Sequence, residues 1–301
     1  MLLADAPLGP SWNIITDIQQ LWSFPFMVNA FRAGTIVAVA SAVMGWFMVL
    51  RRQTFAGHTL AVVGFPGAAA AELLGIGLSV GYFAFCILAA LVIANLPQRA
   101  GRGYTEESAV IGTVQAFALA SGMLFIALYK GFLNGTNALL FGSFLGITSD
   151  QVLILAAVAV AALAVLAVIG RPLLFASIDT DVARAHGVPT QALATIFLVL
   201  LGAAAAEVSQ ITGALLVFAL LVLPPATAQL ITPRPVYSLA LSVGLAIVTV
   251  WVALFIAYYS PYPIGFWLST IAFSLYALTY AGASLRTRLG IRTAQPLPAR
   301  A

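Results

Sequence analysis

Three ionisable side chains lie in or beside long apolar stretches of the sequence and could contact a metal cation. His58, Glu72 and Glu207 supply one imidazole and two carboxylates, which are common ligands of divalent transition metals. A charged side chain at the centre of a bilayer costs about 2.5–3.5 kcal/mol on insertion scales, so one inside a span usually faces a polar pathway. We therefore treat these three residues as candidates for a cation pathway.

Each candidate also has an ordinary structural explanation. His58 opens a predicted span, where its imidazole can bond loop carbonyls instead of a metal. Glu72 falls near the outer end of the same span, where a carboxylate can face water. Glu207 is predicted in an outer turn between two spans, where it either meets an incoming cation or is simply solvated. Pro224 and Pro225 remove backbone donors from another span, and the resulting break suits either a gate or a packing kink.

Other polar and small residues in the spans favour a packing role. Gln115 is predicted to bond across helices, as intramembrane amides commonly do. Gly64, Gly67, Ala68 and Ala71 recur at three- and four-residue spacing and predict a face for close helix packing.

The composition is that of an integral membrane protein. Of the 301 residues, 62% are hydrophobic and 7% are charged, whereas soluble domains carry about 25% charged residues. The mean hydropathy is +1.06. The single cysteine, Cys86, excludes internal disulfides and thiolate clusters, and the N-terminus lacks the basic region of a cleaved signal peptide. The net charge of +4 comes from arginines at loop edges and is no argument for nucleic-acid binding.

Apolar runs predict an all-α polytopic fold with about nine transmembrane helices. The predicted spans are Ala33–Leu50, His58–Leu78, Ser79–Leu96, Ser108–Leu128, Gln151–Gly170, Gln191–Ala206, Ile211–Ile231, Val236–Tyr258 and Gly265–Leu285. Residues 1–32 form an extracytoplasmic or interfacial segment, residues 33–285 the transmembrane domain and residues 286–301 a cytoplasmic tail. Within the first segment, Trp12 to Asn29 predicts an amphipathic helix at the membrane surface, with Trp22, Phe24 and Phe26 as anchors.

The arginines predict the orientation of the bundle. All of them except Arg32 follow odd-numbered spans, which places those loops in the cytoplasm by the positive-inside rule. The N-terminus is then outside and the C-terminus cytoplasmic.

A polar stretch at residues 177–189 interrupts the apolar chain and predicts a short cytoplasmic helix. Asp179 occupies an N-cap position and Gly187 a C′ position. The polar side of this helix carries Asp179, Asp181, Arg184 and His186, with Ala183 among them in the sequence. Val182 and Ala185 could insert into a partner. The alternative is a solvated surface loop.

The sequence carries no motif for nucleotide hydrolysis or proteolysis. A P-loop needs Gly-Lys-[Ser/Thr], but Lys130 lies between Tyr129 and Gly131, and HExxH does not occur. The pattern GxSxG occurs once, at residues 77–81, but it lies where two predicted apolar spans meet rather than at the strand-to-helix turn that a hydrolase needs. The chain is therefore not expected to be an enzyme. Transport through it would depend on a partner ATPase or on an ion gradient.

Five segments in order resemble the ABC-3 family of permeases, which import zinc, manganese or ferrous iron. They are Arg51–His58, Gly64–Ala68, Leu140–Ser143, the positions Asp179, Ala183 and Gly187, and the span containing Gly213–Val217 and Leu223–Ala228. The resemblance covers roughly Phe31 to Leu285. It implies a fold like that of type II ABC importers, with residues 177–189 as the helix that couples to the ATPase.

The resemblance also implies partners and a location. A homodimer in the bacterial cytoplasmic membrane would form the pathway, with two ATPase subunits that use ATP and an extracytoplasmic metal-binding protein. The chain would hold no permanent cofactor, and zinc is the first expected cargo, followed by manganese and iron. Family members commonly carry Asp and His four residues apart in span two, whereas this chain has His58 and Val62. The usual paired ligation on one helix face is therefore lost.

Two other functions stay open from the sequence. The first is an ABC permease for a siderophore or cobalamin. The second is a gradient-driven secondary transporter, which would normally pair ionisable groups at the midplane of inverted repeats. No such pairing is apparent in the sequence.

Overall fold

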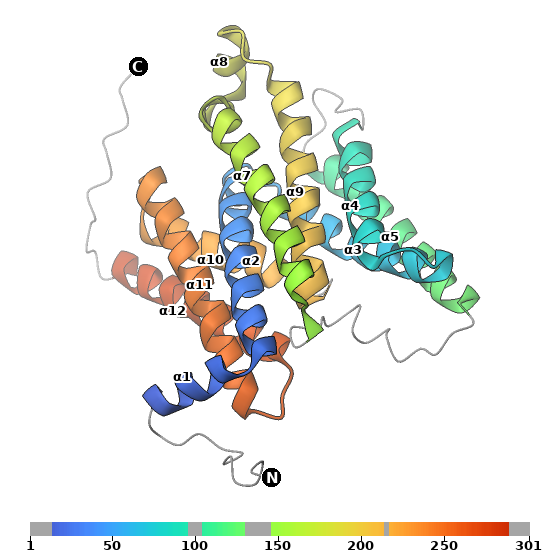
Figure 1. Cartoon of the computed structure of the whole chain (residues 1–301). Helices are drawn as coiled ribbons and strands as arrows, with labels where there is room; N and C mark the ends of the chain where they lie inside the picture. Colours follow the sequence, from blue (N-terminus) through green and yellow to red (C-terminus); the bar gives the residue numbers. More distant parts are fainter. Residues whose placement is uncertain (1–13, 96–103, 130–145, 214–216, 289–301) are drawn as a thin grey trace, which may run out of the picture.

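The computed structural model describes residues 14–95, 104–129, 146–213 and 217–288, and these residues form eleven helices and no strand (Figure 1). The helices are α1 (Ile14–Ser23), α2 (Pro25–Leu50), α3 (Thr54–Leu74), α4 (Leu78–Asn95), α5 (Tyr104–Leu128), α7 (Ser149–Ile178), α8 (Thr180–Ala185), α9 (Thr190–Thr212), α10 (Val217–Ile231), α11 (Pro235–Tyr259) and α12 (Ile264–Arg288). The predicted all-α class is confirmed. The segment Leu140–Ser143, Lys130 and the tail beyond Arg288 lie outside the described residues.

Seven of the described helices are long and apolar enough to cross a membrane, namely α2, α4, α5, α7, α9, α11 and α12. Helix α10 is apolar but has only 15 residues. Helix α3 has 21 residues, but His58, Pro66 and Glu72 lower its hydropathy. Both helices overlap predicted spans. The positions of the predicted spans therefore agree with the structure, whereas their expected number of about nine is only approximate.

Packing divides most of the long helices into two groups (Figure 1). Helices α2, α10, α11 and α12 form one group, called here the α2 group, and α3, α4 and α5 form the other, called the α3 group. Helix α9 packs against members of both groups, and α7 lies along α2 and α9. The chain passes from the α2 group into the α3 group at the turn of residues 51–53.

The first span begins earlier than the sequence predicted. Helix α1 ends at Ser23, Phe24 is extended, and Pro25 starts α2, because proline at the first helical turn gives up no helical hydrogen bond. The expected interfacial helix from Trp12 to Asn29 is thus two helices, and α2 includes Arg32. The anchors Trp22 and Phe24 are exposed as expected, and Trp22 stacks on Phe31 with ring centroids 6.1 Å apart.

Helix α9 continues beyond the predicted end of its span at Ala206. The run of small residues at 203–206 favours helix, and the helix stops only at Gly213, whose φ of +78° suits glycine. Glu207 is therefore inside a helix. Its predicted place in an outer turn was wrong.

Helix α10 runs through both prolines without a break in its assignment, and it is shorter than the predicted span Ile211–Ile231. Pro225 has no N–H to donate to the carbonyl of Leu221. That carbonyl lies against Gly45 of α2, so closely that a Cβ at position 45 would collide with it. The helix therefore continues where a break was expected, and it packs closely against α2 at this point. The role of these prolines as a gate stays a prediction.

Helices approach closely where glycines remove side chains. A Cβ on either Gly67 or Gly81 would collide with the backbone carbonyl of the other glycine, so α3 and α4 cross backbone to backbone. A Cβ on Gly202 of α9 would lie 2.8 Å from the Cys86 carbonyl of α4. The predicted packing role of the small-residue face is confirmed at Gly67, as is that of Gln115, which accepts a 3.0 Å hydrogen bond from Thr59.

We expect Gly81→Ala to destabilise the protein because the added methyl group overpacks the crossing of α3 and α4. Overpacking of a tight contact costs about 1–3 kcal/mol. Gly244→Ala is the matched control, since a Cβ at this helical glycine of α11 meets no atom within 4 Å. Thermal unfolding in detergent, followed by fluorescence-detected size exclusion, should show a lower melting temperature for Gly81→Ala only. Equal losses in both variants would contradict the crossing.

Candidate functional site

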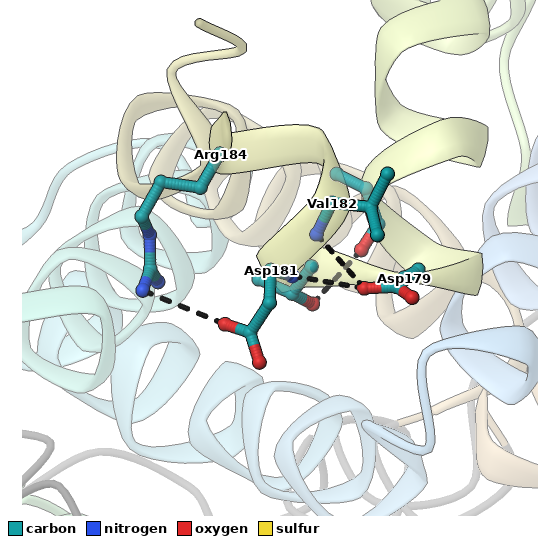
Figure 2. Close-up of polar contacts among 6 residues, drawn as sticks. Asp179, Asp181, Val182 and Arg184 are labelled. Carbon is teal, nitrogen blue, oxygen red and sulfur yellow. Dashed lines mark hydrogen bonds and ion pairs between the residues drawn. The ribbon is translucent and has the colours of Figure 1, made fainter. Parts of the chain in front are cut away.

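Helix α8 is a short capped helix at one end of the bundle, at the top of Figure 1. The Asp179 carboxylate accepts hydrogen bonds from the backbone N–H groups of Asp181 at 3.1 Å and Val182 at 2.9 Å, as Figure 2 shows. These bonds satisfy donors that the first turn of a helix leaves free. The predicted N-cap is therefore present.

The other end of α8 closes on Gly187. This residue has a φ of +79°, and its N–H donates to the carbonyl of Arg184, while the N–H of Val188 donates to that of Ala183. This pair of bonds is a Schellman motif, which favours glycine at the left-handed position. Ala183 is fully buried, so α8 is fixed to the bundle by one face.

The outer face of α8 combines apolar and charged side chains. Val182 and the adjacent Ile178 are exposed, at 42% and 73%. Arg184 and Asp181 form a 3.7 Å ion pair that is highly exposed and therefore contributes little stability (Figure 2). The Nδ1–H group of His186 donates to the Val182 carbonyl, 2.9 Å away. An exposed, rigid helix with this mixed surface is suited to contact a partner protein.

His58 lies in the second turn of α3, facing α10. Its ring meets that of Phe218 edge to face with centroids 5.0 Å apart. The Nδ1 atom is buried and has no hydrogen-bond partner among the described residues. One turn further, Val62 is buried and offers no ligand. The predicted alternative was that His58 bonds loop carbonyls. Its Nδ1 atom makes no such bond within the described part of the chain.

Glu207 is fully buried in α9, and neither carboxylate oxygen has a hydrogen-bond partner among the described residues. An ionised carboxylate that is buried without a partner costs much free energy unless a cation compensates it. The group is therefore either protonated or in need of a nearby cation. Ser209, two residues later, donates to the Ala61 carbonyl of α3 at 3.4 Å. Residues two apart point about 160° away from each other on a helix, so Glu207 faces away from α3.

The candidates do not converge on one chelating site. Glu72 is exposed in the last turn of α3, just before the left-handed Gly75. No group of three or more His, Cys, Asp or Glu side chains within residues 14–95, 104–129, 146–213 and 217–288 is placed to hold a metal ion. His58 and Glu207 are therefore not members of a three-ligand group in the part of the chain that the structure describes.

Sequence reasoning missed the structural role of Arg51, which it used only to predict orientation and as part of the segment Arg51–His58 in the family resemblance. The guanidinium donates to Gln53 Oε1 at 3.2 Å and to Ser177 Oγ at 3.1 Å, and it lies over the Phe197 ring at 5.5 Å. Burial lowers the pKa of Arg51 from its ordinary value. Nothing in the sequence distinguishes Arg51 from its exposed neighbour Arg52, because the contacts come from helices far along the chain.

Comparison with known proteins assigns the chain to a family. The family model described as "ABC 3 transport family" matches residues 23–282. The chain belongs to this family. The resemblance to this family found in the sequence is thereby confirmed, and the chain is a multi-pass membrane protein of a permease family.

Individual relatives agree with this assignment. The chain is 25% identical over 268 residues to the manganese transport system membrane protein MntC of Halalkalibacterium halodurans, covering 89% of this chain and 91% of the relative. It is 29% identical over 240 residues to the chelated iron transport system membrane protein YfeC of Yersinia pestis, covering 80% of each. The solved structure of PsaBC from Streptococcus pneumoniae in complex with Fab matches with a TM-score of 0.79 at 26% identity, covering 89% of this chain and 95% of the other.

We expect Asp179→Ala to loosen α8, because two amides lose their acceptor. Loss of an N-cap costs about 1 kcal/mol, and local hydrogen exchange should quicken about fivefold. Arg184→Gln is the control, since it removes only the exposed ion pair. Hydrogen–deuterium exchange of the peptide spanning α8 would measure both variants. Unchanged exchange in Asp179→Ala would show that the cap does not hold the helix.

Proposed function

We propose that this chain is the permease subunit of an ATP-driven importer of divalent transition metal ions. The observation that carries the proposal is α8, a capped helix exposed at one end of a membrane bundle in a member of the ABC 3 transport family. The chain itself has no P-loop, so the energy comes from a separate ATPase. Helix α8 is the natural contact for that subunit.

The proposed assembly contains two copies of this chain, two cytoplasmic ATPase subunits and an extracytoplasmic metal-binding protein. It lies in the bacterial cytoplasmic membrane with α8 and the C-terminus on the cytoplasmic side, as the arginine distribution favours. A loaded binding protein docks outside, the ATPases close on ATP, and α8 carries that motion into the bundle. The pathway then opens alternately to the two sides.

Manganese or ferrous iron is the cargo that the relatives favour. MntC is named for manganese transport and YfeC for chelated iron, whereas the sequence analysis preferred zinc. An imidazole and a carboxylate suit manganese and iron as well as zinc, so the residues themselves do not separate the three metals. Zinc is therefore the third candidate for the transported ion, after manganese and iron.

His58 and Glu207 are the proposed contacts of the ion on its way, with Glu72 as a further candidate at the exposed end of α3. Each presents ligand atoms that no described side chain occupies or, for Glu72, that solvent reaches. Because the ligands are separate, each holds the ion only briefly. Capture at high affinity then belongs to the binding protein.

Metal uptake into proteoliposomes tests this function directly. The vesicles contain the chain with its ATPase and binding protein, and manganese, iron and zinc are supplied in parallel, with and without ATP. We expect ATP-dependent accumulation of manganese or ferrous iron. An ATPase variant that cannot hydrolyse ATP is the control.

Two results would overturn the proposal. Accumulation driven by an ion gradient without ATP would indicate a secondary transporter. An intact complex that accumulates no free metal but takes up an iron chelate would indicate a permease of the siderophore type.

We expect Glu207→Gln to slow uptake by about tenfold while the protein stays folded. Glutamine has nearly the same shape but cannot be ionised, so it removes the cation contact without a cavity, and the melting temperature should not fall. Asp150→Asn, an exposed change in the first turn of α7, is the control. Uptake rates and melting temperatures are measured on the same preparations. Uptake by Glu207→Gln equal to that of Asp150→Asn would remove Glu207 from the pathway.

A further inference from the structure

Arg51 joins three segments that are far apart in the sequence. It is the C-cap residue of α2, and its guanidinium bonds Gln53, the N-cap residue of α3. The same guanidinium bonds Ser177 near the end of α7 and lies over Phe197 of α9. The start of α3 is therefore tied to the two helices that carry α8 between them.

The tie sits where the chain changes from the α2 group to the α3 group. Arg52, the next residue, has a φ of +58°, a left-handed conformation that non-glycine residues adopt only in sharp turns. The turn also fixes the entrance of the helix that carries His58. A displacement of this turn would move His58 relative to Phe218, which belongs to the α2 group.

Partial burial of the Arg51 guanidinium costs free energy. Among the carboxylates whose side chains the structure describes, which leaves out residues 104–107, none forms an ion pair with its guanidinium. A partly buried cation without a counter-charge costs free energy, and neutral hydrogen bonds and an aromatic face compensate only part of it. Arg52 carries the same charge at no such cost because it is exposed.

Ser177 places the tie next to α8. Its hydroxyl lies two residues before Asp179, which caps α8, and it also donates to the Leu173 carbonyl in the last turns of α7. A rigid shift of α8 therefore moves the hydroxyl that Arg51 holds. Thr180 Oγ1 donates to the Ala176 carbonyl of α7 at 3.0 Å and Ala183 is fully buried, so α8 is attached to the end of α7.

We propose that Arg51 is a positioning residue that transmits displacement of α8 to the start of α3 and so to His58. This inference rests on the proposed function, in which a partner ATPase moves α8. Arg51 does not contact the cargo. Its planar guanidinium reaches Gln53, Ser177 and Phe197 at the same time, which the point charge of a lysine cannot do.

The first experiment measures coupling in the complete importer. Metal uptake and ATP hydrolysis are recorded on the same proteoliposomes for the wild type and for Arg51→Gln, Arg51→Lys, Ser177→Ala and Arg52→Gln. We expect both Arg51 variants to hydrolyse ATP but to transport about tenfold fewer ions per ATP, a loss typical of coupling between distant sites. Ser177→Ala should also lower the number of ions transported per ATP, but by a smaller factor. Arg52→Gln, which removes the same charge one residue away, should match the wild type.

A merely structural role for Arg51 gives a different result. Uptake and hydrolysis would then fall together at a constant ratio, with a lower melting temperature. Rescue by Arg51→Lys would show that charge alone matters. An equal loss in Arg52→Gln would show that the turn needs positive charge rather than this tie. Each of these results overturns the proposal.

The second experiment needs no ATPase and no cargo. Spin labels on Ala185→Cys in α8 and Phe55→Cys in α3 report their separation by double electron–electron resonance in the full chain in nanodiscs. Both positions are exposed, and the native Cys86 is buried and stays in place. We expect Arg51→Gln to broaden or shift the distance distribution relative to wild type and Arg52→Gln to leave it unchanged. An unchanged distribution in Arg51→Gln overturns the tie, even if the wild-type importer transports no metal and the proposed function fails.

Discussion

The structure depends on helices that approach each other backbone to backbone. In a bilayer, lipid chains are as apolar as leucine, so helices associate through close packing rather than through burial of apolar surface. Gly67 and Gly81 provide such a contact between α3 and α4, Gly202 provides one between α4 and α9, and Gly45 provides one between α2 and α10. The two groups meet directly at the turn after Arg51 and at the contact of His58 with Phe218, and α9 packs against both groups.

Local chemistry made much of the fold predictable from the sequence. The all-helical class follows from composition, and most span positions follow from apolar runs that end at charged or small polar residues. The caps of α8 were predictable because Asp179 and Gly187 each act on amides and carbonyls within a few residues. The bond between Thr59 and Gln115 was predictable in kind, because an amide inside a membrane needs a partner on another helix.

The remaining features depend on contacts between distant segments. Glu207 looked like a turn residue because a glutamate after an apolar run usually ends a span, yet the helix continues to Thr212 and ends only at Gly213. Pro224 and Pro225 looked like a break, but the helix continues through them and the freed carbonyl of Leu221 packs closely against Gly45 of another helix. Arg51 looked like a topology signal because its partners lie in α7 and α9.

The separation of the candidate ligands has a consequence for transport. Structural zinc sites in proteins take four ligands, whereas no group of three or more ligating side chains forms among the described residues around His58 or Glu207. Even two copies of the chain in the proposed homodimer bring only paired contacts of one kind. An ion that must leave quickly needs sites that are weak enough to release it. In the proposed function, Val62 beside His58 leaves that contact without a second ligand, so selection of the metal belongs to the proposed binding protein.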